Sequence, residues 1–194
     1  MKPVLRSVSV ALLLSVPCAA EALYWIEPCT DPATSCVAGD VELARWALEA
    51  WQSASGGKLQ FVETKDKARA LIRVVWAGPT DGLYGEAVPI LVDGRRGAQL
   101  NVRIISGTGD SGTKDTLLRD TIVYLTCLHE SGHALGLPHT AQFADIMYSF
   151  QFGGDIPEYF GRYRRKLATR EDIRKNSGLS EADRTKLAEL VKSR

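Results

Sequence analysis

The chain has 194 residues, of which 45% are hydrophobic and 24% are charged, and 24 Lys and Arg residues nearly balance 23 Asp and Glu residues. A formal net charge of +1 gives no electrostatic reason to expect a nucleic acid or an anionic membrane surface as a partner. This length suffices for one domain with a sizeable core, so we expect a single folded domain after any targeting segment.

Residues 1–22 are expected to be a secretory signal peptide. They have a charged start, an apolar run over residues 8–16 that is too short to span a bilayer, and small residues at the cleavage positions Ala20 and Ala22. No later apolar run is long enough for an integral membrane segment. The sequence therefore predicts a secreted or periplasmic protein whose folded domain spans residues 23–194.

The first half of this domain predicts short strands around one helix. Leu43, Trp46 and Trp51 recur at helical spacing, which predicts a helix over residues 41–53 with Asp40 as its N-cap. Runs of β-branched and apolar residues predict the strands. The last of them is nearly continuous in apolar residues, so we expect it to be buried on both faces. These strands are 23–26, 59–63 and 70–76.

Four cysteines bear on the redox chemistry of the chain. Cys18 leaves with the signal peptide, and Cys29 and Cys36 flank a loop that contains proline. Export to an oxidising compartment favours a disulfide between Cys29 and Cys36, while two free thiols, or one thiol that reaches a metal, are the alternatives. Cys127 is expected to be a buried apolar side chain.

Residues 78–112 are rich in glycine and predict two strands, 86–91 and 98–105, joined by a tight turn at Asp93-Gly94. Acidic residues beside glycines usually form turns, and no D-x-D-x-D-G calcium loop is present. Ca²⁺ is therefore only a possible second ion. The residues that would hold it are Asp81, Asp93 and Asp110.

The second half predicts two long helices. The first begins after the N-cap Asp115 and carries apolar residues at helical spacing as far as Gly136. The last helix spans residues 180–192 and begins with a capping-box-like pair, Ser180 and Asp183. Positive charge is concentrated between the helices, where we expect a solvated surface, with a preference for acidic substrates as the alternative. The basic runs are 162–166 and 170–175.

All three histidines lie within residues 129–139, which have the pattern H-E-x-x-H-x-x-G-x-x-H. His129 and His133 are one helical turn apart and share a face, and Gly136 can end the helix in a left-handed conformation so that His139 supplies a third nitrogen. Three neutral imidazoles leave the fourth position of a zinc ion open, as a catalytic site requires. We therefore expect one catalytic Zn²⁺ held by His129, His133 and His139.

Glu130 is the expected catalytic residue. It directly follows the first histidine, so its carboxylate lies beside the metal and can take a proton from the attacking water and pass it to the departing amine. An isolated H-E-x-x-H occurs by chance in many helices, but three histidines at this spacing are far more specific. Zinc binding alone needs no general base, so Glu130 favours an enzyme over a binding module.

This motif, followed by Ile146-Met147-Tyr148, resembles the metzincin zinc peptidases. The seven residues between His139 and Met147 are similar to the short interval of the matrixin group. The resemblance covers nearly all of residues 23–194 and implies an α+β catalytic domain with a twisted mixed β-sheet and two long helices. It implies that the active-site helix ends at Gly136 and that a C-terminal helix follows the turn around Met147, the Met-turn. It also implies that the Met147 side chain forms an apolar floor beneath the metal.

The chain also departs from the matrixin pattern. Thr140 stands where matrixins usually carry serine, and there are no histidines for a second, structural zinc. No Pro-Arg-Cys-Gly latency segment is present, so we expect an enzyme that is active on secretion, or one held by Asp31 or by a thiol of the Cys29–Cys36 segment. Residues 149–177 form a longer segment than in compact matrixins and are expected to shape the substrate pocket.

The sequence thus predicts a secreted, monomeric zinc endopeptidase that acts on a protein or peptide substrate. We expect residues 98–105 to be the edge strand to which the substrate pairs. Two alternatives are a zinc-binding module of the same fold without turnover, and a surface-interaction protein that uses the basic residues 162–175.

Overall fold

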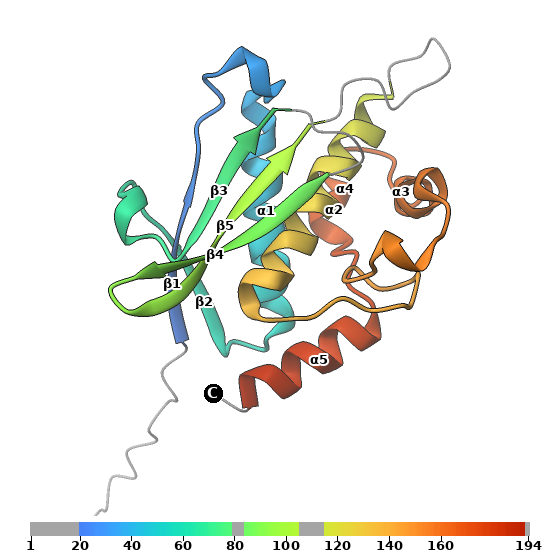
Figure 1. The fold of residues 1–194 in the computed structure, drawn as a ribbon. Coiled ribbons are helices and arrows are strands. Elements are labelled where there is room, and N and C mark those ends of the chain that lie inside the picture. Colours follow the sequence, from blue (N-terminus) through green and yellow to red (C-terminus); the bar gives the residue numbers. More distant parts are fainter. Residues whose placement is uncertain (1–19, 79–83, 105–114, 193–194) are drawn as a thin grey trace, which may run out of the picture.

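A computed structural model describes residues 20–78, 84–104 and 115–192, so most of the expected signal peptide lies outside the described residues. The chain forms a mixed α/β structure with a five-stranded sheet in the order β2-β1-β3-β5-β4 (Figure 1). The strands are β1 (Ala20–Ile26), β2 (Leu59–Glu63), β3 (Ile72–Ala77), β4 (Gly85–Val92) and β5 (Arg95–Arg103). The helices are α1 (Ala38–Ala54), α2 (Thr116–Leu135), α3 (Ile156–Arg164), α4 (Asp172–Lys175) and α5 (Glu181–Lys192), with 3₁₀ turns η1 (Pro32–Thr34), η2 (Lys67–Arg69) and η3 (Phe150–Phe152).

The sheet is mostly parallel. β1 pairs in parallel with β2 and β3, β3 pairs in parallel with β5, and only β4 runs antiparallel, against β5. The expected α+β class fits this mixed architecture. The expectation that residues 98–105 form the edge strand is wrong, because β5 lies between β3 and β4 and the free edge on this side is β4.

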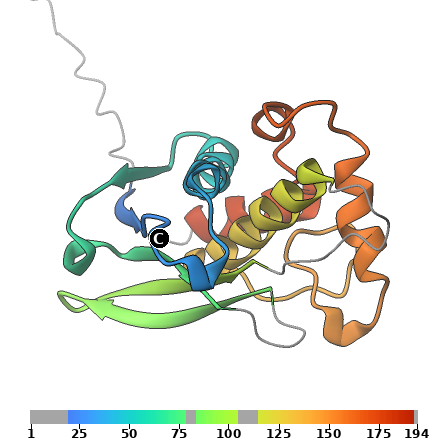
Figure 2. The same ribbon diagram turned by 90° about the horizontal axis from the view of Figure 1, so that it is seen from above.

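Helices α1 and α2 lie side by side over one face of the sheet (Figure 2). Alternating residues of the strands point into this layer, so β3 buries Ile72, Val74 and Trp76. The residues between them, such as Arg73 and Val75, are only half-buried. The prediction that β3 is buried on both faces is therefore wrong, since the helices cover only one face.

Helix α1 begins three residues earlier than its sequence pattern indicated. Its N-cap is Val37, and Asp40 occupies the third helical position instead of the expected N-cap. From there the Asp40 carboxylate reaches back and accepts the N–H of Val37 at 2.9 Å. This is the reciprocal half of a capping box, in which an acidic side chain satisfies a backbone donor before the helix.

The N-terminal connection between β1 and α1 is closed by a disulfide between Cys29 and Cys36, as predicted. Asp31, a candidate for blocking a metal site, instead accepts the N–H of Ala33 and caps η1. Cys127 is buried, as expected. In the described parts of the chain, no helix is both long and apolar enough to cross a membrane.

Candidate metal centre

Helix α2 presents the first half of the motif with the predicted boundaries. The Asp115 carboxylate accepts the N–H of Leu118 and caps its start, and Gly136 ends it with a φ of 96°. A residue with a Cβ rarely adopts this left-handed conformation, which accounts for the glycine. The N–H of Leu137 then bonds back to the Gly132 carbonyl, which turns the chain sharply toward His139.

The structure brings His129, His133 and His139 together. The Nε2 atom of His139 lies 3.2 Å from that of His129 and 3.0 Å from that of His133. Nitrogens bound about 2.1 Å from one tetrahedral zinc would lie roughly 3.4 Å apart, which is close to these distances. The three side chains form a group that could hold a metal ion.

Backbone carbonyls fix the orientation of two of the imidazoles. The Nδ1 atom of His129 lies 2.6 Å from the Ile146 carbonyl, and the Nδ1 atom of His133 lies 2.9 Å from the Leu137 carbonyl. A carbonyl only accepts, so each Nδ1 carries the hydrogen and each Nε2 is left with a free lone pair. Burial lowers the pKa of His129 to about 4, which keeps this imidazole neutral.

These assignments show that the residues fit a metal ion. The Nε2 atoms of His129 and His133 both point at His139, whose single Nε2 hydrogen could bond to only one of them. Burial, followed by the effect of His133, lowers the pKa of His139, which also disfavours the cationic form. A divalent cation at the meeting point would satisfy all three nitrogens at once.

Met147, the expected apolar floor of the metal site, packs against α2 at Gly132, the residue before His133. Its side chain is fully buried. A Cβ added to Gly132 of α2 would come within 2.3 Å of the Met147 Sδ atom and 3.1 Å of Trp51, so the glycine lets the floor approach the helix. The Ile146 peptide beside it is fixed by the Asp183 carboxylate, which accepts its N–H at 2.8 Å.

Glu130 lies next to the histidines and is buried, with 6% of its surface exposed. Burial raises the pKa of Glu130 to about 7, Glu86 adds to this effect and Arg103 opposes it. A Cβ added to Gly85 on β4 would lie only 2.6 Å from the Glu130 carboxylate, so a larger residue would displace this carboxylate or the strand. A carboxyl group with a pKa near neutrality is suited to take and return a proton.

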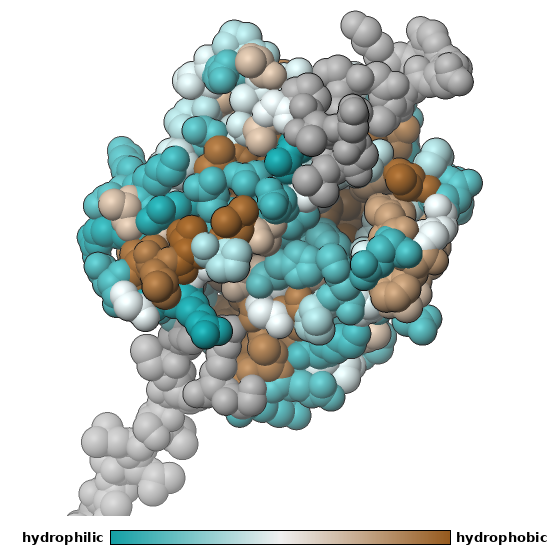
Figure 3. Space-filling model, viewed as in Figure 1, coloured by the Kyte–Doolittle hydropathy of each residue, from teal (hydrophilic) through white to brown (hydrophobic). Residues whose placement is uncertain are grey.

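A cleft of about 450 Å³ opens beside the metal centre. One wall is formed by Tyr84, Gly85 and the following residues of β4, and the floor by α2. The opposite wall comes from the long segment after Met147, as the sequence predicted, and is built from η3 and α3. Figure 3 shows apolar side chains gathered on the part of the surface formed by this segment, with a hollow between the segment and the sheet. Its wall residues are Tyr148, Ser149, Phe150, Gln151, Tyr159 and Phe160.

The free edge of β4 presents backbone groups along this cleft. Ala98 on β5 donates its N–H to Leu71 on the β3 side, and Ala98 lies opposite Pro89. In an antiparallel ladder, the backbone N–H and C=O groups of two paired residues either all point toward the partner strand or all point away from it. Because the backbone groups of Ala98 point toward β3, the carbonyl of Pro89 points to the free edge. Gly85 and Ala87, at even spacing from Pro89, point the same way. The edge thus offers two complete N–H and C=O sets beside Glu130.

The basic segment after the cleft wall is largely neutralised by acidic partners. Among its arginines, Arg164 pairs with Asp115 at 3.0 Å and Arg174 with Glu49 at 3.1 Å. Arg165 likewise pairs with Glu158. These pairs disfavour the idea that the whole segment recruits acidic substrates.

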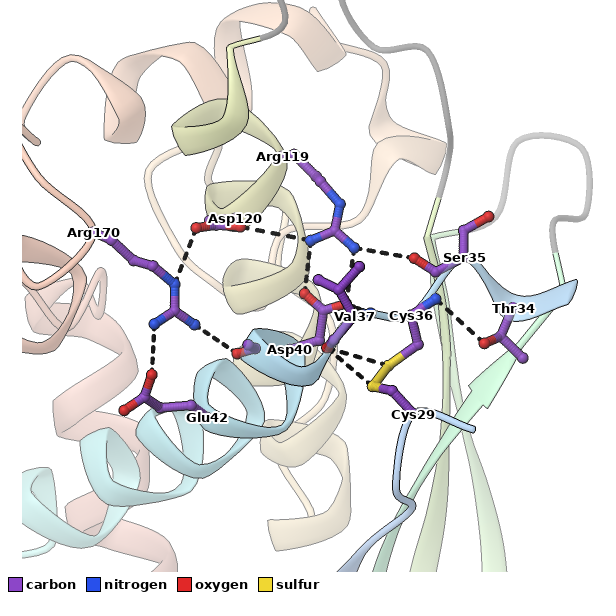
Figure 4. A network of polar contacts seen from close by, with 11 residues as sticks. Cys29, Thr34, Ser35, Cys36, Val37, Asp40, Glu42, Arg119, Asp120 and Arg170 are labelled. Atoms are coloured by element: carbon purple, nitrogen blue, oxygen red, sulfur yellow. Dashed lines mark hydrogen bonds and ion pairs between the residues drawn. A yellow bond between two sulfur atoms is a disulfide. The ribbon is translucent and has the colours of Figure 1, made fainter. Parts of the chain in front are cut away.

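Arg170 belongs to a polar network around the buried Asp40 near the start of α2, which we call the junction cluster (Asp40, Glu42, Arg119, Asp120 and Arg170; Figure 4). Arg119 donates to both oxygens of the fully buried Asp40, at 2.7 and 2.8 Å. Arg170 bridges Asp120 and Glu42 and stacks over Trp46. The cluster joins α1, α2 and the segment before α4, and Arg119 also donates to the Ser35 carbonyl within the disulfide loop.

Sequence reasoning identified the histidines and Glu130 but missed two residues that shape the site. Gly85 was left outside its strand, although glycine in a strand often marks a close backbone approach. Tyr159, in a helix that was not predicted, donates its hydroxyl to the Asp145 and Ile146 carbonyls. Of the calcium candidates, Asp81 and Asp110 lie outside the described residues, and Asp93 occupies the β4–β5 turn with a φ of 49°.

The sequence was compared with protein-family models and with curated proteins, and neither comparison found a match. The geometry of the site combines three converging imidazole nitrogens, a buried carboxyl group of raised pKa and a strand edge beside an apolar cleft.

Proposed function

We propose that this chain is a secreted zinc-dependent endopeptidase of the metzincin type, most like the matrixin group. The observation that carries the proposal is the convergence of three imidazole Nε2 atoms beside the buried Glu130. Supporting features are the end of α2 at the left-handed Gly136, the buried Met147 beneath the helix, and a C-terminal helix, α5, that follows.

Histidines 129, 133 and 139 would hold the zinc ion, which when bound supplies a Lewis acid that polarises a carbonyl and acidifies a water molecule. Glu130 takes the proton of the attacking water and delivers it to the nitrogen of the departing amine. A pKa of about 7 allows Glu130 to accept this proton near neutral pH and to release it again.

The substrate of the proposed enzyme is an extended segment of protein or peptide. Gly85 and Ala87 pair with its backbone as an added strand, because their N–H and C=O groups face the free edge of β4. The aromatic wall opposite, which includes Phe150 and Tyr159, receives a side chain of the substrate.

The test is cleavage of an unfolded protein, such as reduced casein, by the purified secreted chain with one equivalent of zinc. Glu130→Ala should lower the rate by a factor of about 10² to 10⁴, because it removes the general base. The same variant should retain one zinc ion per chain, because it removes no ligand. Glu49→Ala, which removes a carboxylate from a surface ion pair, should leave the rate unchanged.

The results separate the proposal from its alternatives. A wild-type chain that binds zinc but cleaves no substrate would be a zinc-binding module without turnover. Full activity in Glu130→Ala would contradict the assigned mechanism. Cleavage that persists after zinc has been removed by chelation would contradict the metal's role.

A further inference from the structure

A second cavity lies next to the proposed cleft and serves none of the roles assigned so far. Its volume is about 510 Å³, and it lies among α3, the turn after α4 and the start of α5. Leu125 and Tyr159 contribute to the walls of both cavities, so the two are neighbours. A volume of this size is ordinary for a site that binds a small molecule.

The walls of this second cavity are strongly basic. Four of its described lining residues carry a positive charge, and none of the described lining residues is acidic. Ser177, Ser180 and Asn176 add hydroxyl and amide groups to the wall. The four basic residues, which we call the basic quartet, are Arg162, Lys166, Lys175 and Arg184.

The basic quartet differs from the neighbouring arginines, most of which are neutralised by carboxylates. Among the described residues, Arg162, Lys166 and Arg184 form no ion pair, and Lys175 pairs only with Asp172, at 3.1 Å from an exposed position. Like charges gathered around one cavity repel each other, so an unoccupied quartet is electrostatically unfavourable. A bound anion would remove that repulsion.

Two members of the quartet are held in place by the fold. The Arg162 guanidinium carbon lies 4.5 Å from the centre of the Tyr159 ring and 4.8 Å from that of Phe143, stacked against both aromatic faces. Arg184 donates to the Ser177 hydroxyl at 2.7 Å. Stacking leaves the edge of a guanidinium free to donate hydrogen bonds, so Arg162 presents fixed donors.

The nearest buried carboxylates do not line the cavity. Asp145 accepts hydrogen bonds from the hydroxyls of Ser180 and Thr140. Asp183 accepts from the backbone N–H groups of Ser180 and Ile146. Asp145 bonds to the inner framework through both oxygens and Asp183 through Oδ2 only, and neither residue lines the cavity.

We propose that this cavity binds a phosphate or sulfate ester of a small organic molecule. A doubly or singly charged tetrahedral oxyanion has three oxygens that can accept from several of these cationic groups at once. The cavity is much larger than the oxyanion alone, so it also has room for the organic group that carries it. This site is independent of the proposed peptidase chemistry.

The experiment is calorimetric titration of the secreted chain after chelation and exhaustive dialysis, so that no anion can bind a metal ion. The probes are inorganic phosphate, inorganic sulfate, glucose 6-phosphate and glucose 6-sulfate, at constant ionic strength set with chloride. We expect saturable binding with one site per chain. Tighter binding of an ester than of its inorganic anion would show that the organic group is recognised too.

The test variant is Lys166→Gln/Arg184→Gln, which removes two members of the quartet. It should weaken binding about ten-fold or more, because two charge-assisted contacts are lost. The matched control is Arg165→Gln/Lys186→Gln, which removes the same net charge from neighbouring positions that do not line the cavity. Unfolding of each variant in chloride alone confirms that it is folded.

Three results would overturn the proposal. The first is the absence of saturable binding by all four probes up to about 10 mM, a concentration at which even weak specific sites are occupied. The second is an equal loss of affinity in the quartet variant and the charge-matched control, which would show unspecific attraction. The third is equal affinity for esters and inorganic anions. It would show that the site recognises a free oxyanion, and it would contradict the proposal that the cavity also binds an organic group.

Discussion

Helix α2 carries two polar clusters that differ in how their groups are satisfied. In the junction cluster near its start, Arg119 meets both oxygens of Asp40, and Arg170 meets Asp120. In the histidine centre at its other end, nitrogen lone pairs converge with too few donors among them. Polar groups that are paired around a buried carboxylate hold elements together, whereas nitrogen atoms that converge with too few donors can hold a ligand.

The largest effect is expected when the histidine centre loses one of its three imidazoles. His133→Ala should abolish zinc retention after dialysis, because two imidazoles and a water-filled gap bind zinc far more weakly than three imidazoles. For the wild type, free zinc at a thousand times its dissociation constant should add about 4.1 kcal/mol to the free energy of unfolding. Denaturant unfolding with and without zinc measures this difference, which should vanish in His133→Ala.

Glu130→Gln is the control for this prediction. It changes the neighbouring side chain without removing a ligand, so the stabilisation by zinc should remain. If His133→Ala were still stabilised by zinc as strongly as the wild type, the metal would have to bind elsewhere in the chain.

The next largest effect is expected at the junction cluster. Asp40→Ala should lower the free energy of unfolding by about 3 kcal/mol. It removes the closer of the two carboxylates that pair with the half-buried Arg119, and it leaves the N–H of Val37 without an acceptor. Zinc affinity per folded chain should not change. Denaturant unfolding and zinc titration measure the two quantities separately.

An exposed ion pair provides the comparison for Asp40. Glu158→Ala removes the carboxylate that pairs with Arg165, where both side chains are largely exposed, and should leave the free energy of unfolding almost unchanged. Equal losses from Asp40→Ala and Glu158→Ala would remove the distinction between a buried junction and a surface pair.

A third prediction concerns the contact beneath the metal centre. Gly132→Ala should destabilise the protein by about 2 kcal/mol, because its Cβ would approach the Met147 sulfur to 2.3 Å. Shortening the neighbour in Gly132→Ala/Met147→Ala should make the two changes less than additive. A double-mutant cycle by thermal unfolding tests the contact, and strict additivity would show that the two residues do not meet.

A smaller effect than at Gly132 is expected at the end of α2. Gly136→Ala should cost about 1 kcal/mol, since a φ of 96° is unfavourable for a residue with a Cβ. Gly136→Asn should cost less, because asparagine tolerates left-handed backbone better than alanine. Chemical denaturation of both variants provides the ranking, and the reverse order would contradict the assigned conformation.

Local signals in the sequence predicted the parts of the fold that depend on near neighbours. The cap at Asp115 and the glycine at 136 fixed the bounds of α2, and with them the positions of the metal ligands. The Ser180–Asp183 capping pair likewise marked the start of α5, where each residue accepts the backbone N–H of the other.

Features that depend on distant partners were not predictable in the same way. Asp40 was taken for an N-cap because its partner Arg119 lies 79 residues along the chain. The prediction that β5 is the edge strand failed because strand order is set by tertiary pairing. The pattern of residues within one strand does not determine which strands lie beside it. The cleft wall was expected to come from residues 149–177, but helix α3 within it was missed, since it is short and rich in charged residues.

The proline in β4 has a consequence for self-association. A free strand edge is a template for pairing with a second copy of the same chain, which leads toward aggregation. Pro89 faces that edge and has no N–H, so a ladder of intermolecular hydrogen bonds started at Gly85 and Ala87 loses a donor there and is weakened. Leu91, two residues after Pro89, is 74% exposed, and its side chain would add an apolar contact to a ladder that extended so far. The edge can therefore receive a short peptide while resisting the growth of a shared sheet.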